Sequence, residues 1–481
     1  MILSRSSILR GGSSVSDIVV LCVQLLAMAR YELLLFAAVG LFLGGLDELA
    51  IDLSGWRAGC RGRITVYSRH PRASMATLPT SPQPGAMAVF IPAWDEAAVI
   101  GPMLGHALAQ WRGEDCILFV GCYPNDAATL KIVTDIAFAD SRVLPVITDR
   151  AGPTTKAHCL NALWRAMRRH ERANAMRFKG VVLHDAEDVV HADELRLFDY
   201  LLDRFALVQT PVLPLPDPTS RWVGGHYLDE FAESHTRAMI VREALGAALP
   251  SAGVGCAFSR DVMGRIAERM DGDPFDAQSL TEDYELGMRV RELGGVGVMV
   301  RIRDAAGGLV CTREYFPATL PDAVRQKTRW TIGISLAGWD RIGWSGGAME
   351  RWMRLRDRRA PLAAMVLTAA YLGAILHTVL TVAARFGLPG SAINDPLLAG
   401  LIAVTLPLLI WRLVWRVAFV AFHYGWIEGI RAVPRAFLGN IIAIMAAWRA
   451  MAIYLRMWRG EPPRWDKTRH RFPDMPHGEA A

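Results

Sequence analysis

The hydrophobic pattern near the N-terminus predicts a membrane anchor. Residues 33–46 carry no charged side chain, and with their flanks they approach the roughly 20 residues that a helix needs to span a bilayer. The whole apolar region is too long for a signal peptide and lacks a convincing cleavage site. We interpret residues 17–29, which are also apolar, as a separate interfacial helix or as a second crossing. The predicted anchor covers residues 1–55.

Apolar stretches return towards the C-terminus. Residues 361–384 are free of charge and long enough to cross a membrane, and a second crossing begins near Pro396. A third stretch, residues 436–448, offers only 13 residues between two arginines, which is typical of an interfacial or re-entrant segment. We therefore predict two full crossings within a region of interfacial and transmembrane helices over residues 346–455.

Two arginines lie near the inner end of that second crossing. Arg412 and Arg416 are one helical turn apart, with Trp411 and Trp415 beside them. Side chains of this kind either line a path for sugar or extend to the membrane surface, where their charge stays hydrated. The pattern leaves both interpretations open.

Between the apolar regions, residues 86–345 follow a different pattern. A short apolar run, a turn and a helical segment recur in that order, beginning at residues 88, 116 and 180. Alternating strands and helices at this spacing predict an open α/β sheet. Such a sheet binds ligands at the carboxyl ends of its strands.

Composition and charge add a membrane to this picture. The 481 residues are 52% hydrophobic, with a mean hydropathy of +0.22 and a net charge of +6. The basic residues flank apolar segments and form no groove-like stripe, which favours membrane lipids over nucleic acid as a partner. Because the seven cysteines show no paired CxxC spacing, we interpret them as reduced cytosolic thiols.

The positions of the basic clusters predict the topology. The clusters lie at residues 57–72, 351–359 and 456–471. Because Lys and Arg next to membrane spans stay on the cytoplasmic side, all three clusters should lie there. We therefore predict that a basic linker (56–85), the central domain (86–345) and a C-terminal tail (456–481) are cytoplasmic.

Three acidic residues follow the apolar run at residues 181–183. Asp185, Glu187 and Asp188 lie so close together that their charges repel one another, an arrangement that usually persists where a cation neutralises it. Carboxylate oxygens suit Mg²⁺ or Mn²⁺, which keep open positions for phosphate. The alternative is an acidic helix N-terminus capped by Asp188 or Asp193.

A second acidic cluster opens the stretch SLTEDYELGMRVRELGG at residues 279–295. Ser279 or Thr281 is placed to cap a helix, and Glu282, Asp283 and Glu285 follow at once. Acids near a helix N-terminus compensate the helix dipole, which is one explanation. The other is a site shared with the glycine-rich loop before it, at residues 250–263, and with RQKTRW after it, at residues 325–330.

Taken together, these motifs resemble those of membrane-embedded family 2 glycosyltransferases. Thr281, Glu282 and Asp283 match the TED motif, and Gln326, Arg329 and Trp330 match Q-x-x-R-W. The acidic triplet precedes them in the family's order. The resemblance is closer to one subgroup, the bacteriophage-adsorption protein B type of inner-membrane glycosyltransferase, through stretches such as LHDAEDV, REYFP and RWDKTRHRFP.

The resemblance implies a GT-A (Rossmann-like) fold, a nucleotide-diphosphate sugar donor and inversion at the anomeric carbon. It also implies the role of each site residue. Asp185 and Glu187 would hold Mg²⁺ or Mn²⁺, Asp283 beside Glu282 would be the catalytic base, Trp94, Glu96, Asp126 and Lys156 would contact the nucleotide, and Gln326, Arg329 and Trp330 would bind diphosphate or acceptor.

The chain departs from the family pattern at two points. The acidic triplet ends in Glu187 and Asp188, which leaves open which of the two binds metal. Many relatives carry an acid directly after the second strand, where this chain has Gly121 and Cys122, and Asp126 is the candidate replacement. Members of the subgroup often continue into a region that responds to cyclic dinucleotides, and such control stays open for this chain.

The expected function is the building of an exopolysaccharide at the bacterial inner membrane from a UDP-sugar, such as a UDP-N-acetylhexosamine. An outer-membrane export protein would be a further partner. Two alternatives remain: the transfer of a single sugar to a lipid-linked acceptor, and a non-catalytic membrane scaffold of an export complex. The intact acidic and Q-x-x-R-W motifs favour catalysis, because a scaffold has no need of a destabilising acidic cluster.

Overall fold

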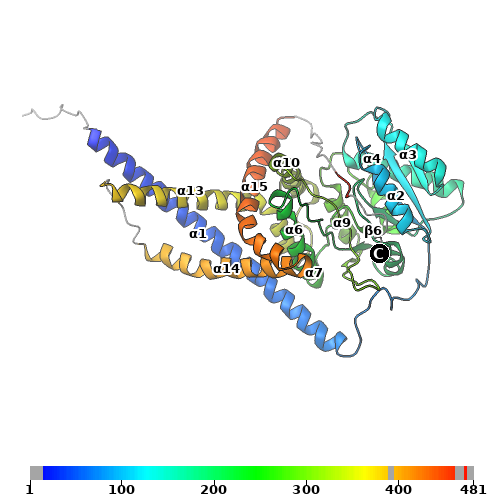
Figure 1. Ribbon diagram of the computed structural model, residues 1–481, viewed down its shortest axis with the longest axis horizontal. Helices are drawn as coiled ribbons and strands as arrows, with labels where there is room; N and C mark the ends of the chain where they lie inside the picture. Colours follow the sequence, from blue (N-terminus) through cyan, green and yellow to red (C-terminus); the bar gives the residue numbers. More distant parts are fainter. Residues whose placement is uncertain (1–14, 388–394, 461–470, 474–481) are drawn as a thin grey trace, which may run out of the picture. The chain divides into compact units, whose positions relative to one another are not determined.

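A mixed seven-stranded sheet forms the centre of an α/β domain (Figure 1). The computed structural model describes residues 15–387, 395–460 and 471–473. The strands are β1 (Met87–Pro92), β2 (Cys116–Cys122), β3 (Val143–Ile147), β4 (Gly180–Leu183), β5 (Leu207–Gln209), β6 (Cys256–Ser259) and β7 (Gly297–Met299). Their order is β3-β2-β1-β4-β6-β5-β7, and only β6 runs antiparallel to its neighbours. The predicted α/β sheet is confirmed.

Helices connect the strands and surround the sheet. They are α2 (Ile100–Gln110), α3 (Ala127–Ala139), α4 (Lys156–Ala173), α5 (Glu194–Leu201), α6 (Val223–Glu233), α7 (Met239–Ala244), α8 (Arg260–Arg269), α9 (Glu282–Glu292), α10 (Leu320–Trp330), α11 (Gly338–Ile342) and α12 (Ala348–Arg358). Three π-helical turns occur: η1 (Arg63–Tyr67), η2 (Ser234–Ala238) and η3 (Thr331–Ala337), which continues α10.

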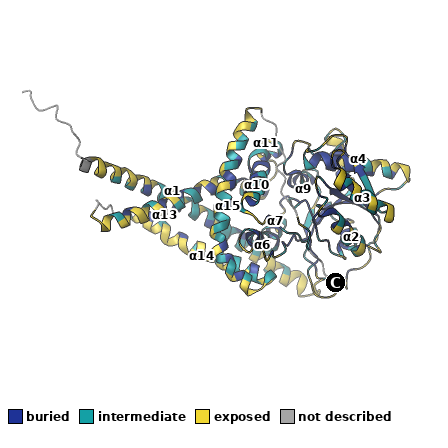
Figure 2. Cartoon of the chain, turned by 45° about the horizontal axis from the view of Figure 1, so that its top comes forward, coloured by how far each residue is buried: buried dark blue, intermediate teal, exposed yellow. Residues whose placement is uncertain are grey.

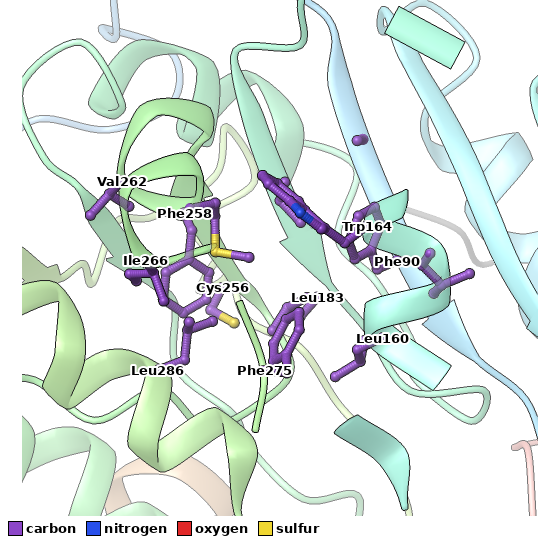
Figure 3. Packing of buried hydrophobic residues seen from close by; sticks show 14 of the residues in the cluster. Phe90, Leu160, Trp164, Leu183, Cys256, Phe258, Val262, Ile266, Phe275 and Leu286 are labelled. Carbon is purple, nitrogen blue, oxygen red and sulfur yellow. The ribbon is translucent and has the colours of Figure 1, made fainter. Parts of the chain in front are cut away.

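Both faces of the sheet are covered, which explains why the strands appear in the sequence as continuous apolar runs. All six residues of β1 are buried, and they alternate between two hydrophobic clusters. Phe90 faces the cluster that α4 and α8 close, where Trp164 and Phe258 pack with it (Figure 3). Val89 and Ile91 face the other cluster, beneath α2. Each large side chain buried in this way contributes about 1.5–3 kcal/mol to the free energy of unfolding.

Among the residues that the structure describes, four helices are long and apolar enough to cross a membrane: α1 (Val15–Gly62), α13 (Ala360–Arg385), α14 (Pro396–Tyr424) and α15 (Trp426–Trp458). Only 6% to 22% of the most apolar window of each is buried, and Figure 2 shows α1, α13 and α14 coloured mainly as exposed or intermediate. Apolar surface of this extent requires a nonpolar environment. The predicted flanking membrane helices are present.

The structure corrects two predictions about these helices. Residues 17–29 are no separate element, because they continue into residues 33–46 as part of α1, which ends beyond the predicted boundary at residue 55. Residues 436–448 form only the middle of α15, which has 33 residues. By length and composition α15 also qualifies as a span, so the number of crossings stays a prediction.

By its internal contacts the chain separates into a helical unit, residues 1–49 with 362–412, and a larger unit, residues 50–361 with 413–481. Within the helical unit, glycines lie where helices touch, and a Cβ built on any of them would collide with its neighbour. The pairs are Gly40 with Val366, Gly45 with Leu408, and Gly373 with Leu34. Small residues at such contacts let helices approach closely, which is the main source of packing energy between helices in lipid.

Both arginines of α14 contact carboxylates. Arg412 lies 3.6 Å from Glu48 of α1, and Arg416 lies 3.5 Å from Glu233 of α6. These ion pairs do not decide between the two interpretations that the sequence left open. Whether the two side chains also contact sugar stays a prediction.

Within the larger unit, α15 packs on α6 and α10. Arg435 of α15 is fully buried, and it lies 2.7 Å from Asp229 of α6 and 2.7 Å from Glu428. Gly225 of α6 provides the space, because a Cβ at this position would meet the guanidinium. Removing one partner of a buried ion pair costs about 3–5 kcal/mol, so this contact fixes α15 to the α/β domain.

Candidate active site

One cavity at the carboxyl ends of β1 and β4 gathers every predicted site residue except Asp126. It encloses about 120 Å³. The predicted residues that line it are Trp94, Glu96, Lys156, Asp185, Glu187, Glu282, Asp283, Gln326, Arg329 and Trp330. The two stretches around residues 282 and 329 therefore share one site, as their motifs suggested.

Asp185 lies two residues beyond the end of β4, directly opposite Lys156. The Nζ atom of Lys156 lies 2.5 Å from Oδ1 of Asp185. Thr155 caps α4 by accepting the His158 N–H, which places Lys156 at the first position of the helix and in the cavity. Burial by itself lowers the pKa of Lys156, but the carboxylates around it, Asp185 first, raise it above its ordinary value. Lys156 is therefore a fixed positive charge among acids.

Asp188 faces away from the cavity. It is fully buried, and its Oδ2 atom accepts the N–H of Asp185 at 3.1 Å and lies 2.7 Å from Nδ1 of His184. Burial lowers the pKa of His184, but Glu194 and Asp188 on its two sides raise it to about 10, so the imidazole is cationic at neutral pH. Of the two acids left open by the sequence, only Glu187 lines the cavity with Asp185. Asp193 stands at the N-cap position of α5 but makes no side-chain cap bond.

The donor set fits Mg²⁺ or Mn²⁺ only with help from a substrate. Across residues 15–387, 395–460 and 471–473, no group of three or more His, Cys, Asp or Glu is placed to hold a metal ion. Metals of this kind in nucleotide sites take one or two carboxylates and complete their coordination with phosphate oxygens and water. Asp185 and Glu187 supply two carboxylates, which matches that pattern.

The TED motif forms the first turn of α9. Asp283 is half-buried, and one of its oxygens accepts the Tyr284 N–H at 2.7 Å. Burial raises the pKa of Asp283, partly offset by Lys156, and burial beside Asp283 raises the pKa of Glu282 to about 7. Thr281 stands at the N-cap position without a side-chain cap bond. Dipole compensation alone therefore does not explain this cluster, because two acids face the cavity.

Glu285, the third acid of that stretch, has a structural role. It is buried, accepts the Ser279 hydroxyl at 2.6 Å and receives Arg341 at 2.7 Å. It does not line the cavity. The contacts tie α9 to the loop before it and to α11.

Gly253 of the glycine-rich loop lies against the carboxylate of Asp283. Its φ of +80° lies in the left-handed region, and a Cβ there would collide with Asp283. We expect Gly253→Ala to lower the free energy of unfolding by about 1–2 kcal/mol through backbone strain. By displacing Asp283, it should also slow sugar transfer by about 10²-fold.

The matched control is Gly246→Ala. Gly246 has a φ of +70°, and nothing lies within 4 Å of its Cβ position. Thermal unfolding should show a similar loss of stability for both variants, whereas transfer assays should show an activity loss for Gly253→Ala alone. Equal activity losses would mean that strain, and not the displacement of Asp283, is responsible.

The Q-x-x-R-W motif occupies the last two turns of α10. Trp330 packs edge-on against Tyr227 and Phe231 of α6, with ring centroids 6.2 Å and 6.4 Å away. The Gln326 carbonyl oxygen is buried without a hydrogen-bond partner among the residues that the structure describes. Arg329 lines the cavity and, within the same residues, pairs with no carboxylate. Both side chains are therefore available to a ligand.

A second cavity of about 520 Å³ meets the first at Asp283 and Trp330. Thr281, Phe231 and Ala252 also border both cavities. Beyond this boundary, the second cavity runs between residues of η2, α9, η3 and α12. Asp283 therefore borders both open spaces.

On the nucleotide side, Trp94 packs edge-on against Tyr123 at 4.9 Å, and Gly152 lies against its ring. Asp126, which was predicted to contact nucleotide, lies outside the lining of this cavity, and its role stays a prediction. Its carboxylate caps α3 by accepting the Thr129 N–H at 3.2 Å and accepts the Asp95 N–H at 2.6 Å. Both oxygens serve the backbone, and the residue does not line the cavity.

The residues that line the cavity without having been predicted include Phe231, Glu314 and Phe316. REYFP, residues 313–317, had been singled out as a motif without a role, and it contains two of them. No local pattern pointed to Phe231, because α6 reaches the site only through tertiary packing.

Comparisons with known proteins agree with this geometry. The model of the family described as glycosyltransferase like family 2 matches residues 83–333. The chain is 38% identical over 462 residues to bacteriophage adsorption protein B of Escherichia coli (strain K12), and equally to bacteriophage N4 adsorption protein B of Escherichia coli O157:H7. Each match covers 91% of this chain and 62% of the relative, so the chain spans less than two thirds of their length.

Among solved structures, a mannosyltransferase from Pyrobaculum calidifontis, in complex with GDP-Man and Mn²⁺, has a similar fold. The TM-score is 0.52 at 17% identity, and the match covers 89% of this chain and all of the other. At this identity the likeness establishes the fold alone. Because the family model matches more than half of the chain, the chain belongs to the glycosyltransferase-like family 2, and its α/β domain is a GT-A glycosyltransferase domain.

Proposed function

We propose that this chain is an inverting, metal-dependent glycosyltransferase that extends an exopolysaccharide from a UDP-sugar, such as a UDP-N-acetylhexosamine. The proposal rests on Asp283 and Trp330, which border both cavities. The first cavity, with its acids, Lys156 and Arg329, suits the nucleotide diphosphate of a donor. The second offers a path for an acceptor, whose hydroxyl would reach the base from the other side.

Each group of side chains then has a chemical task. Trp94 and Glu96 bind the nucleotide, while Lys156 and Arg329 bind the diphosphate by charge-assisted hydrogen bonds. Asp185 and Glu187 would hold Mg²⁺ or Mn²⁺, which when bound offsets the charge developing on the leaving diphosphate.

Asp283 performs the proton transfer. It accepts the proton of the acceptor hydroxyl as that oxygen forms a bond to the anomeric carbon. The bond between this carbon and the diphosphate oxygen breaks on the opposite side, which inverts the configuration. Trp330 presents a flat apolar face to the acceptor sugar, and Gln326 offers its unsatisfied carbonyl oxygen to a hydroxyl.

The proposed setting is the bacterial inner membrane, with the catalytic domain, residues 86–345, on the cytoplasmic side. The basic clusters beside the apolar helices support this orientation. We place α15 at the membrane surface, because the buried contact of Arg435 with Asp229 attaches it to the α/β domain. The C-terminal tail would also be cytoplasmic, although residues 461–470 and 474–481 lie outside the described part of the chain. Membrane lipids and an outer-membrane export protein complete the set of partners.

Removal of divalent metal is expected to lower transfer by at least about 100-fold, because a bound cation contributes several kcal/mol to stabilising the leaving group. The test incubates membranes containing the protein with a panel of UDP-sugars, with and without excess chelator, and then with added Mn²⁺. Product size is read from the same samples. Full turnover in chelator would refute metal dependence, and a product carrying one added sugar would replace polymer extension by transfer to a lipid acceptor.

A further inference from the structure

Three buried ionisable side chains form a row beneath the turn that carries Asp185 and Glu187. Glu194, His184 and Asp188 each have a relative exposure of 0%. An oxygen of Glu194 lies 3.2 Å from Nε2 of His184, whose Nδ1 lies 2.7 Å from Oδ2 of Asp188. None of the three lines the cavity. Burying three such groups is costly unless each is paired, so the arrangement needs a reason beyond packing.

At one end of this row, Asp188 contacts the backbone of Asp185. The Asp188 oxygen that contacts His184 also accepts the Asp185 N–H at 3.1 Å, and the Asp188 N–H donates to the Asp185 carbonyl at 3.3 Å. Both ends of the turn are therefore held by one residue. At the other end of the row, Glu194 is held in a helix, because it is the first residue of α5.

His184 connects this turn to the sheet. The backbone N–H of His184 donates to the backbone carbonyl of Phe90 in β1 at 3.1 Å, and its ring centroid lies 5.7 Å from that of Trp111. His184 is thus held by hydrogen bonds at its backbone N–H and at Nδ1, while Nε2 lies within ion-pair distance of Glu194. A displacement of His184 would move Asp188, and with it the turn that directs Asp185 and Glu187 into the cavity.

We propose that Glu194, His184 and Asp188 are positioning residues that hold Asp185 and Glu187 in place to bind the divalent metal, Asp188 being no ligand itself. This inference rests on the metal site of the proposed function. Two carboxylates that line one cavity repel each other, so the turn that carries them gains from support on its buried side. Partners of metal ligands commonly give such support, and their loss typically weakens metal binding by about 10- to 100-fold.

The experiment measures Mn²⁺ binding directly, by the loss of the free Mn²⁺ signal in electron paramagnetic resonance, with the full chain in detergent and UDP present. Glu194→Gln removes the charge at the end of the row that lies farthest from the metal, with His184 and Asp188 in between. We expect it to weaken Mn²⁺ binding by about 10- to 100-fold, as Asp188→Asn also should. His184→Asn keeps a hydrogen-bond donor near the position of Nδ1 and removes only the contact with Glu194. It should therefore weaken Mn²⁺ binding as Glu194→Gln does, and it supplies a second test in case Glu194→Gln folds poorly.

Glu171→Gln is the matched control. Glu171 of α4 is a buried glutamate paired with Arg260 at 2.9 Å, outside the cavity. This variant should lose thermal stability while binding Mn²⁺ as the wild type does. If Asp188→Asn alone weakens binding, Asp188 is a ligand and the inference is wrong. Unchanged binding in all variants refutes it as well. Absence of Mn²⁺ binding in the wild type would instead remove the proposed metal site itself.

Discussion

Asp283→Asn is expected to leave UDP-sugar binding intact and to slow sugar transfer by about 10² to 10⁴-fold, the usual contribution of general acid–base catalysis. The amide nearly preserves the shape of the carboxylate, including the oxygen that accepts the Tyr284 N–H. It does not accept the proton of the acceptor hydroxyl. Donor binding would be measured by calorimetry and transfer by product formation, so that loss of chemistry is separated from loss of binding.

The neighbouring acid provides the comparison. Glu282 lines the same cavity, and Glu282→Gln makes the same chemical change one residue away. We expect a smaller loss from this variant, because Glu282 is the more buried of the two acids and does not border the second cavity. Retained transfer in Asp283→Asn together with lost transfer in Glu282→Gln would assign the base to Glu282. Retained transfer in both would leave the cluster as a helix N-terminus without a catalytic role.

The pH profile offers a further check on this base. Burial raises the pKa of Asp283 above that of an ordinary aspartate, so the carboxylate is lost at a higher pH as the solution is acidified. As the pH is lowered, activity should therefore begin to fall at a higher pH than the one at which an ordinary aspartate titrates. In Asp283→Asn the residual activity should lack that decline.

Arg329→Gln is expected to lower transfer by about 10²- to 10³-fold, the loss that follows removal of one donor from a developing anion. Arg329 lines the cavity and, as far as the chain is described, pairs with no carboxylate, so its charge is available to the diphosphate. The reduction should appear in both donor affinity and turnover, since the leaving diphosphate gains charge during the reaction. Kinetics over a range of UDP-sugar concentrations would measure both.

Arg325→Gln is the control on the same helix. Arg325 pairs with Asp322 at the start of α10 and does not line the cavity. It should change stability slightly and transfer hardly at all, because partly exposed ion pairs contribute about 0–1 kcal/mol. A comparable loss of transfer in both variants would show that the general charge of α10, and not the position of Arg329, is what matters.

Local patterns accounted for much of the fold and for most of the site. β1, β2 and β4 were predicted because each is a short run of buried apolar residues followed by a turn, and both features are visible within a few residues. The start of α9 followed in the same way from the acids in its first turn. The motif residues were identifiable because their chemistry depends on side-chain type and order. The GT-A fold and the family followed from them.

Other elements depend on partners distant in the chain. β5 and β7 have three residues each, which is too short for a pattern. They form because they pair with each other and because β5 also pairs with β6. The extent of α15 was misjudged for a similar reason. Arg435 was taken as the end of an apolar segment, but in the folded chain Asp229 and Glu428 neutralise it, so the helix continues through it.

Some features of the site are local in the sequence, and others arise only when the chain folds. Residue types and spacing pointed to two acidic clusters and a Q-x-x-R-W motif acting together, since those features reside in short stretches. They left open the choice between Glu187 and Asp188. The tertiary structure places Glu187 in the cavity and Asp188 against His184, so the assignment of Glu187 as the metal ligand stays a prediction that rests on folding. The two cavities that meet at Asp283 likewise arise only from packing, because their walls come from helices far apart in the chain.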